Sequence, residues 1–227
     1  MARDYADETR LSARIAAQQL PSTGPDPRQI AFEAVAEVEP QLILEVGPGL
    51  GELAERMQRE LDARVVAVDQ SERMVELTSA RGVEAIVGNV EDLPFRAGIF
   101  DCAVAAWMLY HVPNLDRAVR ELRRVLRPDG RLVAVTNSAH SQRELWSLVG
   151  YEPRYSFGAE NGEWSLLRHF TIVERRDVHG TVTFPDRDAV HRYVSHSPMA
   201  AHLADNLPVF DGPLVASRHA VVFVCEP

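Results

Sequence analysis

Three glycines at alternate positions, Gly47, Gly49 and Gly51, follow an apolar run that ends at Glu45 and Val46. Glycine has no Cβ atom, so the backbone can turn sharply and a ligand can approach the main chain, while the next helix offers unpaired N–H groups. The pattern predicts a strand, a tight turn and a helix that hold a cofactor. Taken alone, the segment also fits a turn without a ligand. Dinucleotide-binding proteins use a different spacing, G-x-G-x-x-G.

A second acidic residue, Asp69, ends the next apolar run. Its carboxylate can accept hydrogen bonds from two ribose hydroxyl groups, or it can cap a helix that begins near Ser71. A third run ends just before Asn89, whose side-chain carbonyl can accept a hydrogen bond. A fourth run ends at Ala106.

Strand patterns alternate with helical patterns from 42 to 137, which predicts βαβ units and a parallel sheet with helices on both faces. Such sheets bind ligands beyond the carboxyl ends of their strands. Glu45, Asp69, Asn89 and Ala106 all fall at such ends, so four distant segments can share one ligand. Two helices, over about 2–20 and 28–38, precede the sheet and are expected to lie over the cofactor.

Two longer patterns identify a family. The chain reads E-x-G-x-G-x-G over 45–51, and F-D-x7-L-x-H-V-P followed by L-R-x-V-L-R-P-x-G-x-L over 100–132. Over about 40–140 it resembles the class I S-adenosylmethionine-dependent methyltransferases, specifically the small-molecule, type 11-like branch. The resemblance implies a Rossmann-like α/β fold with a doubly wound, mostly parallel seven-stranded sheet and an antiparallel C-terminal edge strand. It also implies S-adenosyl-L-methionine as cofactor and S-adenosyl-L-homocysteine as product.

The resemblance assigns a cofactor site. Tyr5 and Arg14 would close over the methionine end, and Trp107 would wall the substrate pocket. Asn89 would accept a hydrogen bond from the adenine amino group, and Met74 would pack on the adenine. The alternatives are a solvated helix face for Arg14, ordinary core for Met74 and a filled sheet–helix crevice for Trp107. The expected cofactor-binding residues are Tyr5, Arg14, Glu45, Gly47, Pro48, Gly49, Gly51, Asp69, Gln70, Met74, Asn89, Val90, Glu91, Ala106 and Trp107.

Methyl transfer to a hydroxyl or ammonium group requires a base that removes a proton. His titrates nearest neutral pH, so His111 is the first candidate and Tyr110 the second, although both residues also fit a packing role beside the Val112-Pro113 turn. Asn137, Thr136 and His140 follow the fifth strand and are candidates for substrate contact.

Composition limits the partners. The formal charge of −9 and the pI near 5.4 disfavour nucleic acid, whose binding proteins present a basic face. All 24 basic residues are Arg, so no lysine can act as a base.

Cys102 and Cys225 are expected to be reduced core thiols. No metal site is expected, since His191, His196 and His202 lack the i, i+4 spacing of a helical metal pair. A chain without an apolar leader or a long apolar run is expected to be cytoplasmic, away from membranes, and a monomer or homodimer.

A chain of 227 residues with 46% hydrophobic content predicts one domain over 1–227. Within it we expect N-terminal helices over 1–38, a cofactor-binding core over 40–140, substrate-side helices, a strand and a lid over 141–215, and a final strand over 216–227. Thr171 to Phe184 is expected to form a strand or hairpin that bends at His179-Gly180.

The sequence therefore predicts methyl transfer from S-adenosylmethionine to an O or N atom of a small molecule, with secondary metabolites as one class of acceptor. A methyltransferase acting on a protein or RNA and a non-catalytic S-adenosylmethionine-binding protein are the alternatives. An NAD(P)-binding protein is least favoured because the glycine spacing differs.

Overall fold

A computed structural model describes residues 20–197 and 199–227. Its centre is one sheet of eight strands in the order β1-β7-β8-β6-β5-β2-β3-β4. The strands are β1 (Ser22–Thr23), β2 (Leu42–Val46), β3 (Arg64–Asp69), β4 (Glu84–Val87), β5 (Phe100–Ala106), β6 (Leu126–Asn137), β7 (Ile172–Phe184) and β8 (Leu214–Glu226).

The expected fold class is confirmed: β4, β3, β2, β5 and β6 pair in parallel, and β8 is antiparallel to both β6 and β7. Two details differ from expectation. The two-residue strand β1 raises the number of strands to eight, and β8 lies between β6 and β7 rather than at the edge. The C-terminal strand lies inside because β7 pairs with its whole length and covers its outer edge.

Helices follow the strands at the expected places, and polar residues begin several of them. Asp26, Ser71, Asn114 and Asp186 each accept a hydrogen bond from a backbone N–H of the first turn, the N-cap arrangement that starts a helix. The helices are α2 (Pro27–Ala36), α3 (Glu52–Glu60), α4 (Glu72–Ser79), α5 (Leu115–Val125), α6 (Arg143–Leu148), α7 (Gly162–Leu167) and α8 (Arg187–Ser195), with 3-10 turns η1 (Leu109–His111) and η2 (Ala201–Asn206).

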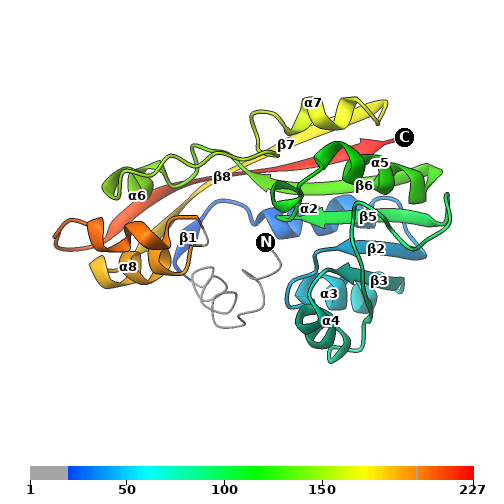
Figure 1. Cartoon of the computed structure of the whole chain (residues 1–227), viewed down its shortest axis with the longest axis horizontal. Helices are drawn as coiled ribbons and strands as arrows, with labels where there is room; N and C mark the ends of the chain where they lie inside the picture. Colours follow the sequence, from blue (N-terminus) through cyan, green and yellow to red (C-terminus); the bar gives the residue numbers. More distant parts are fainter. Residues whose placement is uncertain (1–19, 198) are drawn as a thin grey trace.

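The helices form layers on both faces of the sheet (Figure 1). α5 and α7 pack on one face, where Leu122 and Leu166 join a buried cluster, and α2 and α3 pack on the other, where Val35 and Met57 are buried. β7 and β8 extend beyond the parallel strands, and α6, α8 and η2 bury a third apolar cluster against this extension. Among the described residues, no helix has the length and apolar content to cross a membrane.

The expected bend at His179-Gly180 is wrong, because β7 runs without interruption and both residues pair in register with β8. The glycine serves a close approach instead. A Cβ atom at Gly180 would lie 2.0 Å from the backbone oxygen of Thr23, so only glycine allows β1 to pack there.

Candidate functional site

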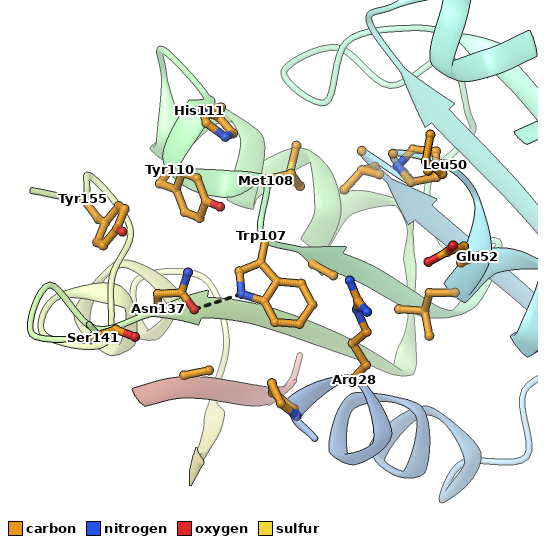
Figure 2. A pocket seen from close by; sticks show the side chains of 18 of the residues that line it. Arg28, Leu50, Glu52, Trp107, Met108, Tyr110, His111, Asn137, Ser141 and Tyr155 are labelled. Atoms are coloured by element: carbon orange, nitrogen blue, oxygen red, sulfur yellow. Dashed lines mark hydrogen bonds between the residues drawn. The ribbon is translucent and has the colours of Figure 1, made fainter. Parts of the chain in front are cut away.

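A cavity of about 650 Å³ opens at the carboxyl ends of β2, β3, β5 and β6. Figure 2 shows side chains that line it, including Trp107, Tyr110, His111 and Asn137. Its wall includes 12 of the 17 expected site residues. They are Glu45, Gly47, Pro48, Gly49, Asp69, Gln70, Met74, Val90, Ala106, Trp107, Tyr110 and His111.

The other five expected residues are absent from the lining of the cavity that the structure describes. Gly51, Asn89 and Glu91 do not line it. Tyr5 and Arg14 lie outside the described residues.

The glycine turn forms one wall of the cavity. The Gly47 N–H donates to the Val68 carbonyl at 2.8 Å, which ties the turn to β3. Gly49 has φ +60° and no atom within 4 Å of the place where a Cβ would stand, so its missing side chain leaves open space. Gly51 has another role. It precedes α3, and a Cβ there would lie 2.9 Å from Thr78 Oγ1, so this glycine permits packing against α4.

Glu45 is a buried acid behind this turn. Its side chain is only 1% exposed, its Oε2 atom has no hydrogen-bond partner among the described residues, and the Ala54 N–H supports the carboxyl group. Burial raises the pKa of Glu45 to about 8. A buried acceptor without a partner fits a site that a polar ligand group completes.

Asp69 and Ser71 lie close together in sequence at the start of α4. Ser71 caps α4, while Asp69 Oδ1 accepts the Ser71 N–H at 2.9 Å. Burial raises the pKa of the Asp69 carboxyl, and hydrogen bonds from the Ser71 and Gln70 N–H groups oppose this shift. Met74, in the first turn of α4, is buried and borders the same cavity.

The loop after β4 differs from expectation. Asn89 is exposed, and its side-chain oxygen accepts the Glu91 N–H at 2.9 Å. Glu91 in turn accepts the Asn114 N–H at 3.0 Å. Both side chains therefore shape the loop by local hydrogen bonds, which compete with ligand contacts. Val90, which lies between Asn89 and Glu91, does border the cavity.

The end of β5 places aromatic residues over the cavity. Trp107 has φ +54°, and its Nε1–H donates to Asn137 Oδ1 at 3.1 Å. The Tyr110 and His111 rings, both in η1, have centroids 4.4 Å apart. The ring of Tyr155 lies 5.2 Å from that of Tyr110. This aromatic wall brings the two candidate bases to the cavity.

Two of the substrate-contact candidates lie elsewhere. Thr136 is buried and donates its hydroxyl hydrogen to the Phe157 carbonyl at 2.7 Å. His140 borders a separate, smaller pocket near α6. Of the three, only Asn137 lines the main cavity.

Sequence reasoning missed several cavity residues. Arg28, in the first turn of α2, places its guanidinium 5.8 Å from the centre of the Trp107 ring (Figure 2). Its position directly after Asp26-Pro27, a helix-start signal, was the only hint available in the sequence. Trp146, Val178, Val182, Tyr193 and Met199 also line the cavity, although they come from α6, β7, α8 and the segment after it. We call these five residues the β7–β8 end of the cavity.

A separate group combines Asp177, His179 and His219, whose potential ligand atoms lie within 4.8 Å of one another. Arg175 donates to both oxygens of Asp177, at 2.7 Å each, so an arginine already neutralises this carboxylate. No spacing along the chain indicated the group, because strand pairing places His219 opposite His179.

Comparison with known proteins finds a family that matches this part of the chain. Residues 44–134, which include the glycine turn, Asp69 and His111, match the family described as methyltransferase domain. Malonyl-[acyl-carrier protein] O-methyltransferase of Chlorobium luteolum is 27% identical over 205 residues, 87% of this chain and 74% of that protein. Both matches agree with the resemblance to the class I S-adenosylmethionine-dependent methyltransferases that the sequence patterns indicate.

Other proteins are similar over shorter stretches or have the same fold. Demethylmenaquinone methyltransferase of Thermotoga maritima is 33% identical over 109 residues, 47% of this chain and 48% of that protein, so the match spans about half of that relative. The YcgJ protein of Bacillus subtilis has the same fold, with a TM-score of 0.64 and 18% identity over 87% of this chain and 98% of that one.

Proposed function

We propose that the protein transfers a methyl group from S-adenosylmethionine to an oxygen or nitrogen atom of a small molecule. The observation that carries the proposal is one cavity that brings together the open glycine turn, the unpartnered Glu45 oxygen and Asp69. Relatives named for the methylation of demethylmenaquinone and of malonyl-acyl-carrier protein support a non-nucleic-acid acceptor.

The residues suit the cofactor part by part. The Gly47–Gly49 turn would face the methionine portion, and Asp69 would accept hydrogen bonds from the ribose hydroxyls. Met74 and Val90 would pack against the adenine. The cofactor supplies an electrophilic methyl group. The chain supplies orientation, which for well-aligned reactants is worth roughly 7 to 11 kcal/mol.

The acceptor would lie against the aromatic wall of Trp107, Tyr110 and Tyr155. His111 borders the cavity there, so it would take the acceptor's proton at one of its ring nitrogens. Tyr110 would position His111 through the contact between their rings.

Thermal unfolding with S-adenosylhomocysteine tests cofactor binding. At a hundredfold excess over the dissociation constant, we expect stabilisation of about 2.7 kcal/mol, with no comparable effect of NADH. Gly49→Val should abolish the effect because its side chain would fill the space beside the turn, and Asp69→Ala should weaken it. Gly82→Val is the matched control, since Gly82 also has a positive φ and open space but lies outside the cavity. An unchanged melting temperature of the wild-type protein with the sulfur cofactors would refute the proposal.

Turnover tests the proposed base. With an acceptor found by incubating the protein, cofactor and a metabolite extract, His111→Ala should lower kcat by about 10²-fold while cofactor affinity stays unchanged. His140→Ala, at the separate pocket, is the control. Wild-type turnover with an unshifted pH profile would assign His111 a packing role. Cofactor binding without any methylated product would favour a non-catalytic protein.

A further inference from the structure

The floor of the β7–β8 end contains an arginine between apolar neighbours. In the β7–β8 register, Arg218 stands opposite Gly180, with the Val178–Ala220 pair on one side and the Val182–Ala216 pair on the other. Side chains of alternate residues share a face of a sheet, so Arg218 lies on the same face as Ala220 and Ala216. Arg218, Val178, Val182 and Ala220 all line the cavity.

Arg218 is half-buried, and its guanidinium has no hydrogen bond or ion pair to the part of the chain that the structure describes. An arginine on the opposite face of the sheet does have a partner, because Arg175 on β7 forms an ion pair with Asp177. Four acids line the cavity, and each has another place or partner. Asp26 caps α2, Glu45 is buried behind the glycine turn, Glu52 forms an ion pair with Arg81, and Asp69 supports the start of α4. A half-buried guanidinium without an anionic partner is costly, and a ligand anion would remove that cost.

The register also places Arg218 relative to the proposed reaction. Across β5, β6 and β8, Ala106 is level with Val135 and Val222. Arg218 lies four residues before Val222 on β8, so strand geometry separates it from Ala106 by about 14 Å along the strands and about 9 Å across them. A group bound by Arg218 would therefore sit well away from the atom that receives the methyl group.

We infer that the acceptor is an elongated, apolar or aromatic molecule with an anionic oxygen group, a carboxylate or a phosphate, at the end remote from the methylated atom. Arg218 binds that group, and the β7–β8 end holds the apolar body through Trp146, Val182 and Tyr193. This inference rests on the proposed function. It makes Arg218 a specificity-determining residue, because a neutral acceptor leaves the guanidinium without its partner.

Two fluorescent probes with a shared skeleton test the inference on the full chain saturated with S-adenosylhomocysteine. 8-Anilinonaphthalene-1-sulfonate carries an anionic group, and N-phenyl-1-naphthylamine does not. We expect Arg218→Gln to weaken binding of the anionic probe by about tenfold or more and to leave the neutral probe unchanged. Arg218→Lys should give an intermediate loss, since it keeps the charge but not the guanidinium geometry. The exposed Arg96, which does not line the cavity, provides the control Arg96→Gln.

Competition then identifies the anion. 4-Phenylbutanoate or phenyl phosphate should displace the anionic probe from the wild-type protein, and 4-phenylbutanol should not; the better competitor identifies a carboxylate or phosphate preference. Equal affinity of wild type and Arg218→Gln for the anionic probe, equal losses for both probes, or displacement by the alcohol as effective as by the anions would overturn the inference. Failure of S-adenosylhomocysteine to bind would instead refute the proposed function.

Discussion

Glu45 shows how one residue can be predictable in position and unpredictable in state. The motif places an acid at the end of β2, but only the packing of Ala54 and the sheet around it removes that acid from water. Burial then raises the pKa of its carboxyl group to about 8, well above the ordinary value for glutamate.

The raised pKa makes the effect of Glu45 on stability depend on pH. Below about pH 4.3 the carboxyl is protonated in both the folded and the unfolded chain. As pH rises, the unfolded chain loses the proton first, so the stability that the protonated group contributes is lost progressively up to about pH 8.

Glu45→Gln should remove this dependence. Between pH 5 and pH 8, we expect the free energy of unfolding of the variant to rise relative to wild type by at least about 1.4 kcal/mol, the equivalent of one pKa unit. Urea denaturation of the cofactor-free protein at both pH values measures this difference. Glu72→Gln replaces an exposed acid and serves as control. A difference that stays constant from pH 5 to pH 8 would contradict the pKa shift.

At the scale of elements, Arg131 on β6 holds α2 against the sheet. Its guanidinium donates to the Ala34 carbonyl at 3.0 Å, to Glu37 at 2.8 Å and to Glu226 at 2.9 Å, and the side chain is only 13% exposed. One residue thus joins α2, β6 and the end of β8. The position of α2 matters for the cavity, because Pro27 and Arg28 line it.

We expect Arg131→Met to lower the free energy of unfolding by about 1.5 to 3 kcal/mol, since it leaves the Ala34 carbonyl and Glu226 without their charged donor, whereas Glu37 keeps its bonds from Arg176. Arg131→Lys should recover only part of the loss because an ammonium cannot reproduce the fork of donors. Arg64→Met, which breaks an exposed pair with Glu84, should cost about 1 kcal/mol or less. Equal losses for Arg131→Met and Arg64→Met in chemical denaturation would show that Arg131 stabilises the fold no more than an exposed ion pair does.

At the scale of the whole molecule, the net charge of −9 bears on the macromolecules that the protein can bind. Nucleic-acid binding relies on neutralising phosphates with basic side chains. We expect no binding of fluorescein-labelled duplex RNA or transfer RNA at 150 mM salt, measured by fluorescence anisotropy with micromolar protein. Saturable binding that weakens with added salt would favour the RNA methyltransferase alternative.

The sequence by itself determined the class of fold and placed at strand ends the residues that we propose to face the cofactor. Apolar runs that end in Glu45, Asp69 and Ala106 are local signals, and parallel pairing necessarily brings such strand ends to one edge of the sheet. The glycine spacing is local as well, because it reflects the backbone geometry of a single turn.

Only the tertiary structure decided which of these residues border the cavity and what stands opposite them. Asn89 and Gly51 match the family pattern, yet a local hydrogen bond occupies one and helix packing explains the other. Arg218 gave no signal in the sequence, since its position depends on the register between β7 and β8. Pairing between distant strands determines that register, and shifting it by one residue would turn Arg218 to the other face of the sheet.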